Sequence, residues 1–194
     1  MRAMWAAILM SVLAACAPPA PEQREQATAP EGAVAANGCA AQVSAMWAAS
    51  AQRSFIVEAV TTGETCADSW ATITIRDESD AVAHVSNYAA SSIRTLSGAE
   101  SIEDMQRRLG EWITPAGASM DSTGDLAAWA EGAAAPSFAD VPFQPAQGIT
   151  RAQYETLRAA DAPMYCYEQS MESGICFAVR DGALGVIGVQ TYAG

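Results

Sequence analysis

The chain contains no lysine, and its single histidine is His84. All ten basic residues are arginines, set against 22 aspartates and glutamates. The missing lysine excludes Schiff-base catalysis and the phosphate-binding loop that depends on a lysine. A metal centre with several histidine ligands is excluded, and any histidine-dependent nucleophilic catalysis would have to use His84. These absences disfavour an enzyme without excluding one.

The formal net charge is -12, and the chain has no cluster of basic residues. An acidic surface repels the phosphates of nucleic acids and anionic lipid headgroups, so nucleic-acid binding is disfavoured. The sequence has no Gly-x-Ser-x-Gly motif, no phosphate-binding glycine loop and no recognisable pair of catalytic carboxylates. We therefore assign no catalytic residue, no metal ligand and no cofactor.

The first sixteen residues have the organisation of a secretory signal. Arg2 precedes an apolar run, residues 3–13, that is too short to cross a bilayer as a mature helix. The run ends in Leu13-Ala14-Ala15-Cys16, which resembles the lipobox of bacterial lipoproteins. The resemblance implies cleavage before Cys16 and attachment of diacylglycerol to its thiol. The alternative is a soluble secreted protein or an uncleaved anchor helix.

The same resemblance implies a location in the cell envelope. Several acyl chains on Cys16 would bind far more strongly than the single chain that gives only marginal anchoring. Ala17 follows the cysteine, where Gram-negative lipoproteins retained in the inner membrane commonly carry an aspartate. The periplasmic face of the outer membrane is therefore favoured over the inner membrane.

The remaining chain is predicted to form a tether and one domain. Residues 16–38 are rich in Pro, Ala, Glu and Gln, with few large apolar side chains, so we expect a disordered tether with a reach of about 25 Å. Residues 39–194 suit one domain. At this length a domain buries roughly 70% of its unfolded surface.

Four cysteines belong to the predicted domain: Cys39, Cys66, Cys166 and Cys176. An even number of cysteines in an oxidising envelope is typical of disulfides. Zinc is the alternative, but no Cys-x-x-Cys pair is present. Of the three possible pairings we predict the one between sequence neighbours, Cys39 with Cys66 and Cys166 with Cys176.

In the first half, the spacing of Val43, Met46 and Trp47 predicts a helix over residues 40–52. Alternating or β-branched runs then predict antiparallel strands at residues 55–60, 70–75 and 82–88. A second helix is expected at residues 102–113, because Ser101 and Asp104 have the spacing of a capping box and an apolar stripe follows.

In the second half, residues 114–148 read as a long connection with a short helix near residues 126–129. Thr150 and Gln153 predict a capped helix to about residue 160. Three strands follow, at residues 164–169, 175–180 and 184–192. Asp181-Gly182 predicts a type I′ turn, which would pair Phe177 with Val186 and Val179 with Leu184.

The fold class predicted from these elements is α+β, with helices packed on a mostly antiparallel sheet and braced by disulfides. Each end of the domain would read as a helix followed by three strands. Local echoes between the two ends suggest an ancient duplication, although two hairpins that obey the same turn rules would explain them equally well.

Candidate sites are few. On an alternating strand, His84 shares a face with Val82, Ser86 and Tyr88. A nearby Ser86 or Tyr88 suits a general base, but we favour a partly buried structural histidine. The acidic stretches 77–80 and 121–125 offer oxygen ligands for Ca²⁺. A solvated turn and a helix cap at Asp125 are the favoured explanations.

Three aromatic residues of the 114–148 connection are the candidate partner surface: Trp129, Phe138 and Phe143. Core packing is the alternative for Trp129. The predicted function is a membrane-anchored, non-enzymatic module that binds a protein or another envelope component. The alternatives are a small envelope hydrolase that uses carboxylates or His84, and a structural or assembly factor of the envelope.

Overall fold

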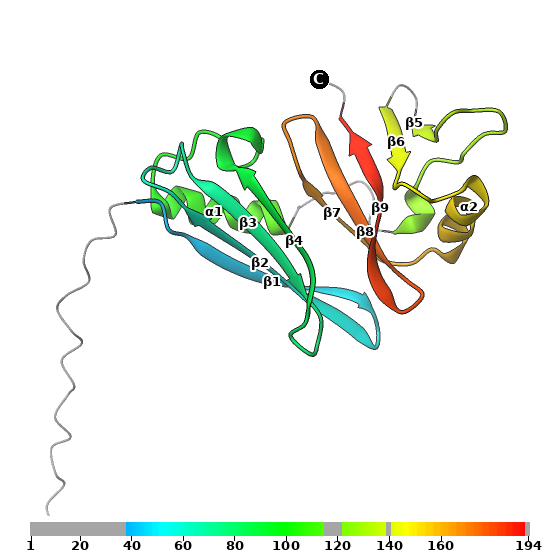
Figure 1. Cartoon of the computed structure of the whole chain (residues 1–194), viewed down its shortest axis with the longest axis horizontal. Coiled ribbons are helices and arrows are strands. Elements are labelled where there is room, and N and C mark those ends of the chain that lie inside the picture. Colours follow the sequence, from blue (N-terminus) through cyan, green and yellow to red (C-terminus); the bar gives the residue numbers. More distant parts are fainter. Residues whose placement is uncertain (1–37, 115–121, 139–140, 193–194) are drawn as a thin grey trace, which may run out of the picture. The chain divides into compact units, whose positions relative to one another are not determined.

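The computed structural model describes residues 38–114, 122–138 and 141–192 (Figure 1). The predicted signal peptide, Cys16 and all of the tether except Gly38 lie outside the described residues, as does Asp121. The chain divides into two units, residues 1–33 and 34–194, and only the second is described below.

The first sheet contains four antiparallel strands in the order β1-β2-β3-β4. Their bounds are β1 (Gln42–Ser50), β2 (Arg53–Thr62), β3 (Trp70–Arg76) and β4 (Val82–Ala89). The strands predicted at residues 55–60, 70–75 and 82–88 are therefore confirmed.

The helix predicted for residues 40–52 is wrong, because this segment forms β1. Trp47 lies opposite Phe55 and stacks on it with ring centroids 5.4 Å apart, while Met46 is 72% exposed on the other face. An alanine-rich segment forms helices readily in isolation, but pairing with β2 gives each inward side chain a cross-strand neighbour. The first half therefore consists of four strands followed by a helix.

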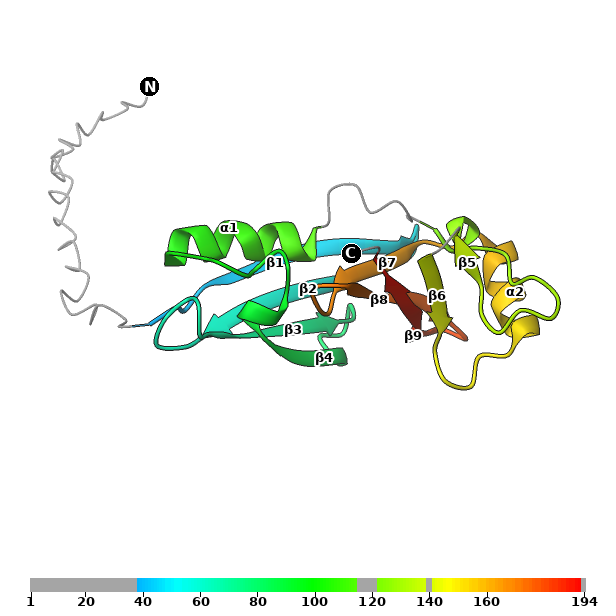
Figure 2. The same ribbon diagram turned by 90° about the horizontal axis from the view of Figure 1, so that it is seen from above.

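Helix α1 (Ile102–Ile113) has the predicted bounds. A short 3₁₀ turn, η1 (Ala90–Ser92), precedes it. The Ser101 side chain accepts a hydrogen bond from the Asp104 N–H at 3.1 Å, whereas the Asp104 carboxylate binds Arg107 and Arg108 instead of completing a capping box. The helix lies along one side of the first sheet (Figure 2). It buries Met105, Leu109, Trp112 and Ile113.

The second sheet is also antiparallel, with the order β5-β6-β9-β8-β7. Its strands are β5 (Ser137–Phe138), β6 (Val141–Pro145), β7 (Met164–Glu168), β8 (Ser173–Arg180) and β9 (Ala183–Thr191). The three strands predicted in this half are confirmed. Asp181 and Gly182 have φ values of 50° and 79°, as a type I′ turn requires, and the predicted pairs across the hairpin are present.

Helix α2 (Arg151–Ala160) begins with the predicted reciprocal capping box between Thr150 and Gln153. Its side chains bind the carbonyl oxygens of the preceding connection. Arg158 donates to Leu126 O, Tyr154 to Ala127 O and Arg151 to Trp129 O, at 2.6 to 2.9 Å.

These bonds explain why the short helix predicted near residues 126–129 is wrong. The helix α2 side chains satisfy carbonyl groups that a helix would otherwise have satisfied internally. The helical turn lies earlier, at η2 (Thr123–Asp125), where Ser122 and Asp125 form the capping box. The connection also supplies β5 and β6, so it is part of the second sheet and not only a surface loop.

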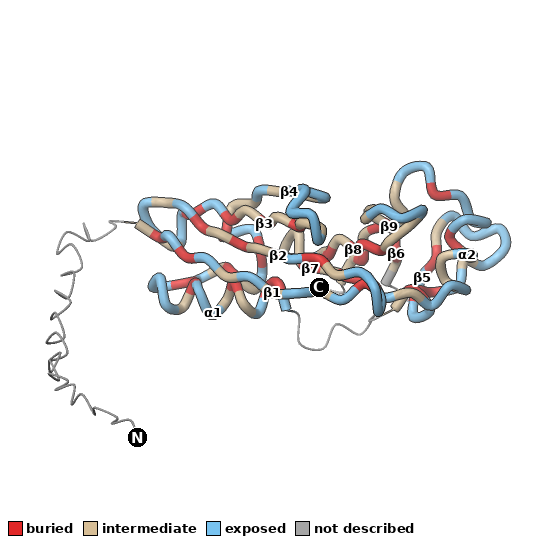
Figure 3. Tube along the Cα trace, turned by 90° about the horizontal axis from the view of Figure 1, so that it is seen from below, coloured by how far each residue is buried: buried red, intermediate tan, exposed pale blue. Residues whose placement is uncertain are grey.

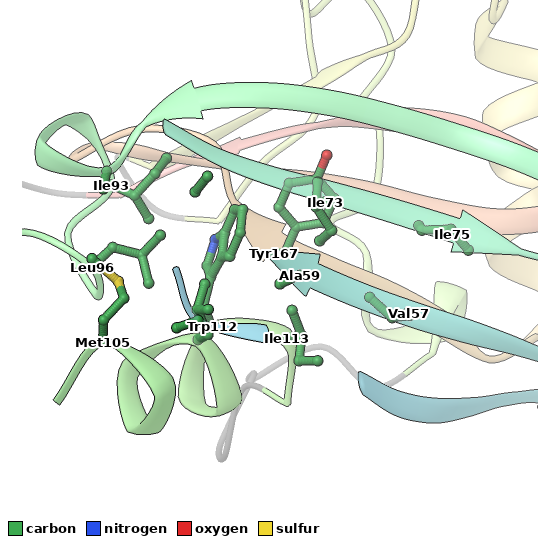
Figure 4. Close-up of a cluster of buried hydrophobic side chains, with 14 of the residues drawn as sticks. Val57, Ala59, Ile73, Ile75, Ile93, Leu96, Met105, Trp112, Ile113 and Tyr167 are labelled. Atoms are coloured by element: carbon green, nitrogen blue, oxygen red, sulfur yellow. The ribbon is translucent and has the colours of Figure 1, made fainter. Parts of the chain in front are cut away.

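Two hydrophobic cores are present. The first joins the inner face of the first sheet, α1 and one face of the second sheet. Figure 4 shows the Trp112 side chain extending from α1 toward Tyr167 within this core. The second core lies between the other face of the second sheet and α2, and includes Phe143, Tyr154 and Ile187. The second sheet is thus covered on both faces.

Both predicted disulfides are confirmed, Cys39–Cys66 and Cys166–Cys176. The first joins the residues before β1 to the loop between β2 and β3, and the second links directly opposite residues of β7 and β8. The α+β fold class is confirmed as well. Neither helix of the described part of the chain is long and apolar enough to span a membrane.

Candidate functional site

The alternation of β4 places His84, Ser86 and Tyr88 on the inner face of the first sheet, as predicted. Val82 does not join them, because the β3–β4 pairing is irregular beside it and Val82 is 53% exposed. The structure adds Tyr167 of β7, which sequence reasoning missed. The His84 Nε2 atom lies 2.9 Å from the Tyr167 hydroxyl and 3.0 Å from Ser86 Oγ. The Tyr167 hydroxyl lies 3.2 Å from the hydroxyl of Tyr88. These four side chains form a polar cluster between the two sheets.

Aromatic rings surround this polar cluster. His84 contacts Phe177 edge-on at 4.7 Å between ring centroids, and Trp112 packs against Tyr88 and Tyr167. Burial lowers the pKa of His84 below its ordinary value of 6.5, and burial also raises the pKa of Tyr167. The neutral imidazole is therefore favoured at neutral pH.

The Ser86–His84 distance is that of a nucleophile and its base, but the surroundings favour a structural role. The same His84 nitrogen also contacts Tyr167, so two hydroxyl groups share it. Among the described residues, no carboxylate is hydrogen-bonded to His84 to orient the imidazole. This arrangement agrees with the favoured interpretation of His84 as a partly buried strand histidine.

The predicted partner surface in the 114–148 connection is not an exposed patch. Phe143 is 0% exposed and packs against Tyr154 in the second core, so its assignment to a surface is wrong. Trp129 is half-buried, with its ring edge-on to Tyr154 and its indole N–H donating to Ala133 O at 2.9 Å. Phe138 contributes its backbone to β5, and its side chain lies outside the described features.

The two acidic stretches are explained by local turn geometry. One Asp77 carboxylate oxygen accepts hydrogen bonds from the Ser79 hydroxyl, the Ser79 N–H and the Ala81 N–H. The Ser79 hydroxyl is the main cause of the lowered pKa of Asp77. In the second stretch, Asp125 closes the η2 turn. Over the described ranges, no three His, Cys, Asp or Glu side chains are grouped to hold a metal ion.

A cleft of about 490 Å³ lies where three turns converge. It is lined by residues of the β1–β2, β3–β4 and β8–β9 hairpins, including Phe55 and Leu184. Its charged groups bind neighbouring chain segments. Arg53 donates to Gly182 O, and the Glu78 carboxylate accepts the Ser54 N–H at 2.8 Å. The cleft therefore lies between the ends of the two sheets, and its charged groups are already used in contacts between chain segments.

The strongest surface feature is the outer face of the first sheet, called here the open face. It consists of the outward side chains of β1 to β4, and no described element covers it. Figure 3 shows more exposed and less exposed residues alternating along these strands. Met46, Ile56, Trp70 and Val85 are 72%, 44%, 58% and 54% exposed on this face.

The arrangement of the open face follows from strand register. Met46 lies opposite Ile56, Val85 opposite Thr74, and Trp70 between Thr62 and Ala89. Polar pairs occupy the positions between them. Gln42 donates to Glu58, and Thr72 donates to Asn87 at 2.6 Å.

Acidic residues flank the open face at both ends of β3. The loop before Trp70 carries Glu64 and Asp68, and the turn after Arg76 carries Asp77, Glu78 and Asp80. A sequence signal for this face existed, since Ile56 and Trp70 have the opposite parity to the buried Val57 and Ile73. It was missed because β1 was predicted to be a helix.

Comparison with protein-family models, with curated proteins and with solved structures finds no match to this chain.

Proposed function

We propose that this chain is a lipid-anchored envelope protein that binds another envelope protein, without catalysis, through the open face. The observation that carries the proposal is the exposure of Met46, Ile56, Trp70 and Val85 on a face that no described element covers. Exposed apolar side chains grouped on one face are typical of protein-binding surfaces. A tryptophan among them is the residue type most often found at energetic centres of interfaces.

Charge indicates the chemistry of the partner. The open face has acidic residues at both ends, and the chain has a net charge of -12 without a lysine. Arg76 is the basic residue of this face, and it already pairs with Asp80 at 3.7 Å. We therefore expect a partner surface that offers apolar residues to the exposed side chains of the open face and basic residues to its acidic ends, because such charges steer association.

The anchor and the location remain part of the proposal. The lipobox residues up to Cys16 support lipid attachment, and the residue after Cys16 supports the outer membrane over the inner. The two disulfides agree with an oxidising compartment outside the cytoplasm. Replacing Cys16 with alanine should move the protein out of the membrane fraction. Retention in membranes of a Cys16→Ala variant from which residues 1–15 have been removed would refute lipid anchoring.

The binding test starts with the full, oxidised, anchored chain as bait in detergent-solubilised envelopes. A captured protein is accepted as a partner only after it has been purified and its affinity for the wild-type chain and for variants of the open face has been measured. Trp70→Ala should weaken binding by about 30-fold or more, the effect of a hot-spot residue. The affinity should also fall as salt is raised, because the expected rim contacts are screened.

Matched variants show whether the open face is responsible. Ile56→Ser and Met46→Ser remove apolar side chains from the face, whereas Ile102→Ser and Met171→Ser remove the same side chains from α1 and from the β7–β8 turn. Ile56 and Ile102 are 44% and 41% exposed, so these two differ mainly in position. Equal binding by all four variants would reject the open face. Turnover of an envelope substrate that is lost in His84→Ala would reject a non-catalytic function.

A further inference from the structure

Strand β1 ends the first sheet, and its outer edge has no neighbouring strand within the described residues. Thr61 N–H donates to Ala41 O and Cys39 N–H donates to Gly63 O, both at 2.8 Å, so odd-numbered residues bond toward β2. Antiparallel pairs alternate along a strand. The N–H and C=O groups of Gln42, Ser44, Met46 and Ala48 therefore point away from β2.

This edge lacks the features that usually protect a strand from further pairing. Over its nine residues β1 has no charged residue and no proline, and its irregularity is confined to the end, between Ala48 and Ser50. Proteins commonly protect edges with charges, prolines, bulges or short strands.

The other sheet ends of the described chain are more restricted. Strand β5 has two residues and β7 has five, and the Trp112 indole donates to Glu168 O at the end of β7. Strand β4 has eight residues and contacts β9, and its pairing with β3 is irregular only at its end near Arg76, whereas β1 contacts α1. Strand β1 is thus the longest of these edges.

We propose that β1 pairs with β1 of a second copy of this chain. An antiparallel pair with its two-fold axis beside Ala45 places Ser44 opposite Met46 of the second copy and Gln42 opposite Ala48. The outward backbone groups of both strands then bond to each other, and the two four-stranded sheets join into one. This inference does not depend on the proposed partner of the open face.

A second copy fits this edge for reasons of charge. Most of the surface of a chain with a net charge of -12 repels another copy, but β1 brings no charged residue opposite itself. Like charges directly opposite would oppose pairing, and here there are none. A cationic foreign strand would find no carboxylate on β1, and the nearby Glu58 already accepts from Gln42.

The position of the preceding chain also allows the pairing. Residues 1–37 lead into Gly38, next to the start of β1. In the antiparallel pair the two Gly38 residues lie roughly 46 Å apart, counting fourteen residues at the strand rise. Two tethers, each with a reach of about 25 Å, allow both anchors to enter one membrane.

The test is sedimentation velocity of the full, oxidised chain in detergent, with Ser44→Pro as the main variant. Proline removes an outward N–H and is tolerated at such edge positions. Each copy loses one hydrogen bond, so the dimer dissociation constant should rise about 30-fold. Ser44→Ala is the matched control and should leave the constant unchanged. Met46→Lys places a positive charge on β1 of each copy, within the paired strands, and should also give monomers.

Amide hydrogen exchange gives an independent measurement. In the wild-type dimer the N–H groups of Gln42, Ser44, Met46 and Ala48 should exchange slowly, and in Ser44→Pro the remaining three should exchange rapidly. A chain that is monomeric at all concentrations, or a dimer insensitive to Ser44→Pro, would overturn the inference. The inference would also be overturned if the β1 N–H groups exchanged slowly only after a peptide of another sequence had been added.

The two proposals fail separately. Trp70→Ala, at the far side of the open face from β1, should weaken partner binding and leave the dimer intact. A monomeric chain that still binds its partner through Trp70 would overturn only the dimer.

Discussion

The two sheets of this protein differ in how their faces are used. The second sheet is packed on both faces, against the first core on one side and against α2 on the other. The first sheet is packed on one face only. Among the described residues, seven large apolar side chains are exposed, and five of them belong to β1 to β4: Met46, Ile56, Trp70, Val82 and Val85.

The difference between the two sheets indicates which apolar residues stabilise the fold and which are available to bind another molecule. The inner residues of β2 and β3 are as deeply buried as the core residues of the second sheet, so the exposed apolar residues of the first sheet do not reflect a poorly formed core. An antiparallel sheet with one solvated face usually carries polar residues there. The apolar residues of the open face are therefore best explained by contacts with another molecule.

The largest expected difference in stability is between alanine variants of two tryptophans, one in the core and one on the open face. Trp112 is 1% exposed in the first core and donates to Glu168 O, whereas Trp70 is 58% exposed on the open face. Trp112→Ala should lower the free energy of unfolding by about 3 to 5 kcal/mol, because it leaves a cavity. Trp70→Ala should change it by less than about 0.5 kcal/mol. Urea denaturation measures both.

A second pair of variants removes the effect of residue type. Ile73 and Ile56 belong to neighbouring strands but point to opposite faces, with 0% and 44% exposure. Replacement by alanine should be costly at Ile73 and mild at Ile56. Comparable losses of stability at both positions, or at both tryptophans, would mean that the open face is part of the folded core.

The disulfides provide the next contrast, because each braces a different sheet. Cys39–Cys66 spans 27 residues and Cys166–Cys176 spans 10. Loop-closure entropy predicts that replacing both cysteines by alanine costs about 3.6 kcal/mol for the first pair and about 2.7 kcal/mol for the second. Thermal and urea unfolding of the two double variants shows which disulfide contributes more to the free energy of unfolding. If the shorter loop contributes more, packing around the buried Cys176 outweighs chain entropy.

Elements with a local signal were predicted well from sequence. Helix α1 has both a capping serine and an apolar stripe, and the Asp181-Gly182 turn has the residues that positive φ values require. Strand β1 has no such signal, since its alanines fit a helix and its alternation fits a strand. Pairing with β2 decides between them, and that contact is not local.

The candidate sites show the same limit. Alternation along β4 correctly grouped His84, Ser86 and Tyr88, but Tyr167 lies 83 residues from His84 in the chain. Phe143 looked like an exposed residue in a loop and lies instead in β6, where it fills the second core. Only the packing of one sheet against the other, or of α2 against its sheet, determines these positions.

The smallest effect concerns the polar contact between the sheets. Because burial lowers the pKa of His84 from 6.5 in the folded state, the unfolded chain binds more protons around that pH. The contribution of neutral His84 to stability is complete above pH 6.5 and is lost as the pH falls through 6.5 toward the lower folded-state pKa. The free energy of unfolding should therefore decrease as the pH falls from about 7.5 through 6.5 and below.

Unfolding of His84→Gln across the same range isolates this effect, because the variant has no imidazole to protonate and the chain has no other histidine. Asp77, Asp104 and Glu155 also have lowered pKa values, but from ordinary values of 3.8 and 4.5, so their contributions are lost at lower pH. Tyr88→Phe keeps His84 and should keep the pH dependence. If the free energy of unfolding of His84→Gln had the same pH dependence as that of the wild type, His84 would not be the cause of this pH dependence.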